Sequence, residues 1–325
     1  MLKRSDILAR VKKEIAVIDC HTHVGVSPKM FINNQYPYCL SFEDLVIRMK
    51  CLGIGFSIVF PRGSTFNLRQ EGAEGDKYYP IFSRYPFEKE NPNLFCEIFE
   101  MFPEYSSMAV PFAFFDPSHF ISEQVENLEI IAQRYPLCGL KTATSYSNSF
   151  IKDLEKNGRP ILDFARRHRL PFIIHTSVSP NDRWAAVEDL IALARNNPDL
   201  KFCAAHAARF SKEALDQAAA LPNCYVDVSA FSIHCQLAVE NNAEVAVPGK
   251  RFAADYRNPA QVMEKLARHY PDTILWGTDT PCYYWQTVTL KLKLPYDAEV
   301  KTLKSIDAEI VKNIAWRNTL DFLEF

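Results

Sequence analysis

Eight short, nearly continuous apolar runs recur along the chain, and most are followed by a segment with helical periodicity. Runs this rich in Val, Ile, Leu and Phe are typical of parallel strands that are covered on both faces. Eight strands alternating with helices predict a (β/α)8 TIM barrel, with residues 1–325 as a single domain. The predicted strands are Ile15–Asp19, Phe56–Phe60, Ala109–Phe115, Leu137–Thr142, Pro171–Thr176, Lys201–His206, Cys224–Ser229 and Thr273–Thr278.

A doubly wound parallel sheet is the alternative to a barrel. Such a sheet is expected to carry a glycine-rich turn after its first strand, where a dinucleotide phosphate would bind. This chain has only ten glycines, and its first predicted strand runs into Asp19-Cys-His-Thr-His-Val-Gly25. The barrel is therefore favoured.

Two connections exceed the length of an ordinary barrel loop: residues 61–107 after the second strand and residues 231–258 after the seventh. Both follow strands, so both are expected at the carboxyl end of the barrel, where active sites lie. Long connections in compact domains are often lids or binding loops. Inserts used for packing or oligomer contacts are the alternative.

Charge and composition exclude several classes of protein. The 37 Lys and Arg residues nearly balance the 39 Asp and Glu residues, giving a formal charge of −2, whereas nucleic-acid binding usually needs a basic excess. No apolar run reaches the length of about 18 residues that a membrane span needs. Nine cysteines without a C-x-x-C pair indicate a reducing compartment, and we expect a cytoplasmic protein.

Two histidines lie close to the end of the first predicted strand. Residues i and i+2 of a strand face the same side, so Asp19, His21 and His23 are expected to point one way and Cys20 the other. Two imidazoles on one face provide half of a transition-metal site. Alone, an H-x-H pair is weak evidence.

The other candidates also lie at strand ends. Lys141, His175, His206 and Asp279 close the fourth, fifth, sixth and eighth predicted strands, with spacings of 34, 31 and 73 residues. Because strand ends of a barrel meet at one mouth, we expect these polar side chains to converge there.

These segments resemble those of the amidohydrolase superfamily. The matching segments are VIDCHTHVG, FIIHTS, CAAHAAR and ILWGTDTP, together with the closing helix IVKNIAWRNTLDFL. The most similar branch is the amidohydrolase-related family that contains aminocarboxymuconate-semialdehyde decarboxylase and its hydrolase relatives.

The resemblance implies a role for each matching residue. His21, His23 and His175 would be metal ligands. Asp279 would be a ligand or the base that activates water, and His206 would orient the substrate or act as acid or base. One divalent ion is implied, Zn²⁺ first, with Mn²⁺ or Fe²⁺ as alternatives. A second ion is expected only if Lys141 is carboxylated and bridges two metals; otherwise Lys141 anchors substrate or structure.

Arg62 and Arg209 follow the second and sixth strands. Each is interpreted either as a clamp for a substrate carboxylate or as half of an ordinary ion pair. His168 and His269 lie at predicted helix ends away from the mouth and are expected to be structural. Ordinary loop roles are expected for His119 and His234.

The residues together predict a metal-dependent hydrolase in which metal-activated water attacks a C–N or C–O acyl bond of a small molecule. The alternative on the same site is a decarboxylase of a small unsaturated or aromatic carboxylic acid. A barrel that binds a ligand without catalysis is the third interpretation. Homodimers are common in the resembled branch, and we expect neither nucleic acid nor membrane as a partner.

Overall fold

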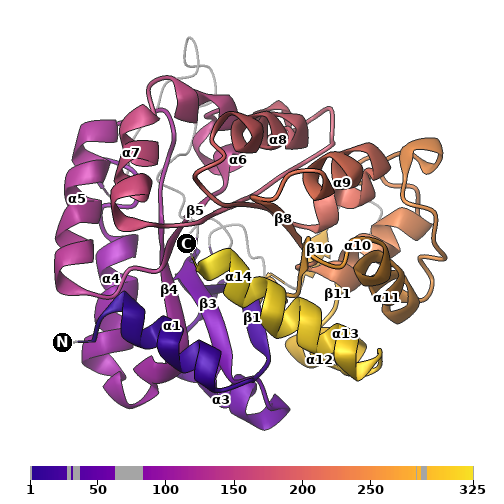
Figure 1. The fold of residues 1–325 in the computed structure, drawn as a ribbon, viewed down its shortest axis with the longest axis horizontal. Helices are drawn as coiled ribbons and strands as arrows, with labels where there is room; N and C mark the ends of the chain where they lie inside the picture. The colour runs from indigo at the N-terminus through magenta and orange to yellow at the C-terminus, as the bar shows by residue number, and fades with distance from the viewer. Residues whose placement is uncertain are drawn as a thin grey trace.

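The computed structural model describes residues 2–27, 31, 37–62, 83–282, 284–286 and 291–324. Its central feature is a ring of eight parallel strands in sequence order, which confirms the predicted barrel (Figure 1). The ring strands are β1 (Ile18–Val26), β3 (Phe56–Pro61), β4 (Ala109–Phe114), β5 (Gly139–Thr142), β6 (Phe172–Ile174), β7 (Phe202–Ala204), β8 (Cys224–Asp227) and β9 (Ile274–Leu275).

The ring closes where β1 meets the end of β9. Backbone hydrogen bonds join the two segments: Cys20 N to Trp276 O at 3.0 Å, Asp279 N to His21 O at 2.8 Å, and His23 N to Thr280 O at 2.7 Å. We call this junction the seam. A short antiparallel strand, β2 (Cys39–Leu40), extends the far end of β1, and β10 (Tyr284–Gln286) pairs with β11 (Lys291–Lys293) as a separate hairpin.

Helices surround the ring, as expected for alternating strands and helices. Ser41 caps α3 through its side chain, which accepts from Asp44 N at 3.0 Å, as the Ser-Phe-Glu-Asp sequence favours. The main helices are α3 (Phe42–Leu52), α4 (Glu90–Cys96), α5 (Ile121–Arg134), α6 (Thr144–Ser147), α7 (Arg159–His168), α8 (Val187–Asn196), α9 (Lys212–Ala219), α10 (Phe231–Val239), α11 (Pro259–His269) and α12 (Tyr296–Lys304).

The amino end of the barrel is covered by the two ends of the chain. Helix α1 (Arg4–Lys13) and the closing helix, α13 (Ala308–Lys312), η7 (Asn313–Arg317) and α14 (Asn318–Leu323), lie across the ring (Figure 1). Arg4 Nη2 donates to Leu323 O at 2.6 Å. Ile7, Val11 and Phe322 pack into the same apolar cluster as the side chains inside the ring, so this end of the barrel is plugged.

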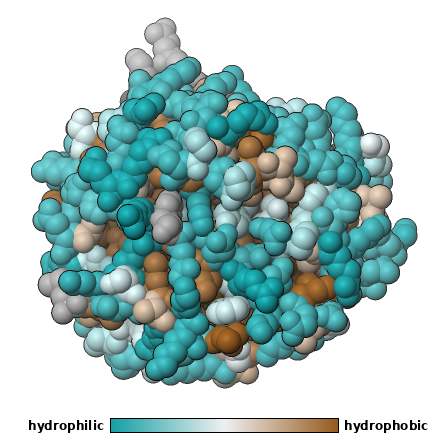
Figure 2. All heavy atoms as spheres, viewed as in Figure 1, coloured by the Kyte–Doolittle hydropathy of each residue, from teal (hydrophilic) through white to brown (hydrophobic). Residues whose placement is uncertain are grey.

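Strand alternation separates two apolar layers. Phe56, Ile58 and Phe60 face the ring interior, whereas Val59 joins the larger cluster between strands and helices. Gly139 is required by this packing, because a Cβ there would lie 2.2 Å from the Phe112 ring. Figure 2 shows mainly hydrophilic side chains on the face viewed, with hydrophobic ones scattered among them.

The two long connections differ from simple loops. Within 61–107 the described part carries α4, η1 (Glu97–Met101) and η2 (Pro103–Met108); residues 63–82 lie outside the described residues. The 231–258 segment contains α10 and a single turn, η6 (Pro248–Lys250). No described helix is both long enough and apolar enough to cross a membrane.

Candidate metal centre and active site

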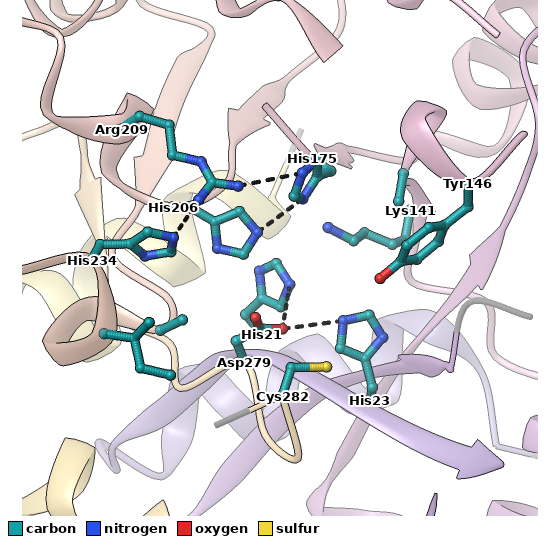
Figure 3. Close-up of a pocket in the computed structure, with 13 residues that line it drawn as sticks. His21, His23, Lys141, Tyr146, His175, His206, Arg209, His234, Asp279 and Cys282 are labelled. Carbon is teal, nitrogen blue, oxygen red and sulfur yellow. Dashed lines mark hydrogen bonds and ion pairs between the residues drawn. The ribbon is translucent and has the colours of Figure 1, made fainter. Parts of the chain in front are cut away.

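A cavity of about 230 Å³ opens at the carboxyl end of the ring (Figure 3). Strand alternation explains which side chains reach this cavity. The positions of β5 and β6 that face the ring interior continue along each strand to Lys141 and His175. The lining residues are His21, His23, Lys141, Ala143, Tyr146, His175, His206, Arg209, Ala230, Ile233, His234, Asp279 and Cys282. All five predicted strand ends therefore meet in one mouth.

Three of the predicted ligands form a compact group at the seam. The ligand atoms of His21, His23 and Asp279 all lie within 4.8 Å of one another, and all three residues are buried. Asp279 Oδ1 is 3.3 Å from His23 Nε2 and 3.5 Å from His21 Nε2. The main chain of β3 orients the His23 ring, since His23 Nδ1 lies 3.2 Å from Pro61 O. This group can hold a divalent cation.

The protonation states of His23 and Asp279 suit metal binding. Burial lowers the pKa of His23 to about 4, so its ring is neutral near pH 7. Burial opposes ionisation of Asp279, but its hydrogen bond with His23 and the nearby His21 outweigh that effect and hold its pKa below the ordinary value. Neutral imidazoles beside a carboxylate are the donors that Zn²⁺, Mn²⁺ and Fe²⁺ accept.

The expectation that Cys20 points away from His21 and His23 is wrong. The pairing of β1 with β3 shifts register between Asp19 and Thr22, and such a bulge breaks simple alternation. Cys20 packs inside the ring with Cys203. Asp19 instead accepts from Thr278 N at 2.9 Å and Thr278 Oγ1 at 2.7 Å, so it fixes the seam behind the metal group.

Asp227, at the end of β8, is a site residue that the sequence reasoning missed. It is fully buried, and its Oδ2 lies 2.8 Å from His21 Nδ1. Its Oδ1 accepts from His206 N and Ser229 N, each at 3.0 Å, and from the Ser229 hydroxyl. Burial opposes ionisation, but His21 and these donors outweigh it, so the pKa of Asp227 is lowered. A carboxylate behind a ligating histidine fixes its tautomer and orientation.

The expected fourth ligand, His175, is turned toward other partners. Its Nδ1 is 3.0 Å from His206 Nε2, and its Nε2 is 3.4 Å from Arg209 Nη2. His206 occupies the middle of the cavity wall: its ring centroid is 4.8 Å from that of His175 and 5.3 Å from that of His21. Burial, followed by the charge of Arg209, holds the pKa of both His175 and His206 well below the usual value.

The direction of every hydrogen bond in this wall follows from Arg209, because a guanidinium only donates. His175 Nε2 must accept, so its Nδ1 carries the hydrogen and donates to His206 Nε2. His206 then carries its hydrogen on Nδ1 and donates to Ser229 Oγ at 2.9 Å.

Ser229 in turn donates its hydroxyl hydrogen to Asp227. Asp227 also accepts from His21 Nδ1. With its Nδ1 directed to Asp227, His21 turns Nε2 toward Asp279 as the atom that can bind a metal. A continuous chain of hydrogen bonds therefore joins Arg209 to the metal group, with donors reaching Asp227 from both sides.

An uncommon backbone places His206 and Arg209. Five successive non-glycine residues, His206 to Phe210, have φ between 46° and 68°. Left-handed conformation costs about 1–2 kcal/mol per non-glycine residue. The 240–252 segment holds the turn: Ala246 N donates to Arg209 O and Phe252 N to Phe210 O, both at 2.9 Å. The second long connection, residues 231–258, therefore stabilises the left-handed turn through these hydrogen bonds.

The expectation of an ordinary loop role for His234 is wrong. It lies on α10, lines the cavity and accepts a hydrogen bond from Arg209 Nη1. Burial and the charge of Arg209 lower its pKa to about 3. The sequence offered one signal for this role, its position shortly after the seventh strand.

Lys141 lines the cavity but is not part of the metal group. It is almost fully buried, its Nζ lies 5.1 Å from the centroid of the Phe60 ring, and burial lowers its pKa. Cys282 also lines the cavity, but burial raises the pKa of its thiol to about 12, which argues against a nucleophilic role.

Arg62 is placed differently from Arg209. It lies at the end of β3 and lines a neighbouring surface hollow with Gly25 and Glu97, not the cavity itself.

His168 ends α7, 3.0 Å from Glu129 Oε2, and His269 ends α11, which confirms that both lie at helix ends. His119 is outside the cavity and bonds Asp116 at 2.9 Å.

Comparison with protein families gives one match: the amidohydrolase family model matches residues 18–325. No curated protein sequence matches the chain.

Solved structures with the same fold include enzymes of two reaction types. One is a 2,6-dihydroxybenzoate decarboxylase, with 12% identity, 95% of this chain and 99% of that chain covered, and a TM-score of 0.58. Another is 5-carboxyvanillate decarboxylase from Novosphingobium aromaticivorans, with 10% identity, coverages of 96% and 98%, and a TM-score of 0.58. A third is dihydroorotase from Campylobacter jejuni, with 12% identity, coverages of 95% and 84%, and a TM-score of 0.56. At these identities the likeness shows the fold.

Proposed function

Because the chain belongs to the amidohydrolase family, we propose that it hydrolyses a C–N or C–O acyl bond of a small molecule with the help of one divalent metal ion. The observation that carries this proposal is the buried group of His21, His23 and Asp279. A divalent ion held there would polarise the substrate carbonyl and lower the pKa of a water molecule. Zn²⁺ is our first choice, with Mn²⁺ and Fe²⁺ as alternatives.

The residues around this group supply the remaining functions. Asp279 is ionised, so it can take a proton from the attacking water and return it to the leaving group. His206, neutral and hydrogen-bonded on both ring nitrogens, is the second candidate for handling a proton or orienting the acyl group. Asp227 holds His21 in the tautomer that leaves Nε2 free. His175 would complete the ligand set by turning away from Arg209.

Decarboxylation of a small carboxylic acid is the second candidate. The observation that favours it is the charge of the cavity: Lys141 and Arg209 line it, with Asp279 as the one carboxylate among the described lining residues. Two of the three solved structures compared above are also named as decarboxylases. The substrate as a small molecule, the cytoplasmic location and the homodimer remain predictions from the sequence.

Elemental analysis tests the metal first. We expect about one divalent ion per chain in the purified protein, its loss in His21→Ala, and its retention in His119→Ala, which changes a histidine outside the cavity. Lys141→Met should keep that one ion. About two ions in the wild type, with one lost in Lys141→Met, would instead indicate a carboxylated bridging lysine. No metal under metal-replete conditions would overturn the proposal.

Substrate panels then separate the two reactions. Lactones, amides and cyclic imides are assayed for hydrolysis, and hydroxybenzoates for CO₂ release, with Asp279→Asn as the inactive control. Hydrolysis without CO₂ release supports the first candidate and CO₂ release supports the second. Inactivity of the metal-loaded protein on both panels would favour a barrel that only binds its ligand.

A further inference from the structure

The guanidinium of Arg209 is fixed in place and almost fully buried, with 3% of the residue exposed. Its Nε donates to Thr176 O at 3.0 Å, its Nη1 to His234 and its Nη2 to His175 at 3.4 Å. A guanidinium has five N–H donors, so each Nη retains one further hydrogen. The Arg209 side chain lines the cavity (Figure 3).

No described acid forms a direct ion pair with this guanidinium. Among the described residues, no carboxylate oxygen lies within the 4.0 Å that defines an ion pair with Arg209. The two acids with the largest influence on its pKa, Glu244 and Asp182, act without direct contact: Glu244 accepts from Ser179 Oγ at 3.1 Å, and Asp182 accepts from Ser145 Oγ at 2.8 Å and lies 3.9 Å from His175 Nε2. Its two direct side-chain partners are histidines. A buried cation with such partners is unfavourable unless an anion joins it.

The backbone fixes where this guanidinium lies. Arg209 is the fourth residue of the left-handed turn that the 240–252 segment holds. His206 separates it from the metal group, with its ring 5.3 Å from His21 on one side and 5.2 Å from His234 on the other. An anion on Arg209 therefore lies across the cavity from the reacting group.

From these contacts we propose that Arg209 is the binding subsite for a carboxylate that the substrate keeps through the reaction. The substrate class is then a small carboxylic acid that presents a second, reacting group to His21, His23 and Asp279. A planar carboxylate matches the two free Nη hydrogens as a bidentate pair, and the cavity of about 230 Å³ has room for a small ring beside it. This inference rests on the proposed function for the identity of the reacting group.

Binding of an inert acid tests the subsite without turnover. Benzoate and its neutral counterpart benzyl alcohol are titrated calorimetrically into the metal-loaded wild type, Arg209→Met, Arg209→Lys and Arg257→Met. Arg257 is exposed and outside the cavity, so its variant makes the same charge change elsewhere. We expect Arg209→Met to weaken benzoate binding about tenfold or more. Arg209→Lys, which keeps the charge but not the fork, should lose less, and Arg257→Met should lose nothing. Benzyl alcohol should bind the wild type and Arg209→Met alike.

Three results would overturn the subsite. They are no saturable benzoate binding to the wild type, equal benzoate affinity in the wild type and Arg209→Met, or an affinity that falls in His21→Ala but not in Arg209→Met. The last result would place the carboxylate on the metal. Thermal unfolding of each variant checks that the fold is retained, and Arg209→Lys serves if Arg209→Met does not fold. Failure of the proposed hydrolysis would leave the benzoate result intact, so the two hypotheses fail separately.

Discussion

Replacement of Asp227 by asparagine tests whether hydrogen-bond direction controls the metal group. Oδ1 of Asp227 faces three donors, whereas Oδ2 faces His21 Nδ1 at 2.8 Å and the Cys203 thiol at 3.9 Å. An asparagine would keep its oxygen toward the three donors, because the opposite orientation would set its NH₂ against the backbone N–H groups of His206 and Ser229. Its NH₂ would then face His21 Nδ1, and His21 would have to move its hydrogen to Nε2, the atom 3.5 Å from Asp279.

That hydrogen would occupy the direction in which a metal is bound. Changes in groups that orient a ligating histidine cost about 10–100-fold in metal affinity, or roughly 1.4–2.7 kcal/mol. We expect Asp227→Asn to lie in this range when metal affinity is measured by competition with a coloured chelator. Asp116→Asn is the matched control, since Asp116 is also a fully buried carboxylate bonded to a histidine, but outside the cavity. Equal affinity in Asp227→Asn, Asp116→Asn and the wild type would refute the tautomer argument.

Two further predictions concern stability. A Cβ on Gly277 would lie 2.8 Å from His21 Cβ, so Gly277→Ala should lower the free energy of unfolding by about 1–3 kcal/mol through overpacking, as measured by urea denaturation. Gly249→Ala is the control, because its added Cβ would meet nothing within 4 Å and the free energy of unfolding should change little. Equal effects of the two substitutions would contradict the clash. The pKa of His234 falls from 6.5 to about 3 on folding, so the unfolded chain takes up the proton first and stability falls as pH drops from about 6.5 toward 3, by on the order of 3–5 kcal/mol. In the metal-free protein, His234→Gln should therefore give a flatter profile of urea midpoint against pH, and an unchanged slope would count against the buried neutral ring.

The sequence was sufficient to predict the barrel and the residues at its mouth. Apolar runs of strand length have a direct physical cause in burial on both faces, and the spacing of Lys141, His175, His206 and Asp279 follows from one strand and helix per unit. The convergence of these residues with His21 and His23 in one cavity confirms that reasoning.

Features that depend on local irregularity were not readable from the sequence. The bulge in β1 turns Cys20 inward, against simple alternation. The left-handed turn that places Arg209 has no glycine to signal it. Asp227 resembles any acid at a strand end until the folded chain brings its donors to it. His234 reaches Arg209 only because α10 follows β8 closely, a contact that depends on tertiary packing.

The position of the metal group on the seam has a consequence for the order of synthesis. His21 and His23 come from the first strand of the ring, and Asp279 follows the last, 256 residues after His23. A ribosome must therefore make most of the chain before the three donors can meet. Nascent chains that end before Asp279 carry only the histidine pair, so the complete ion-binding group forms only once synthesis has passed the final strand and the ring can close.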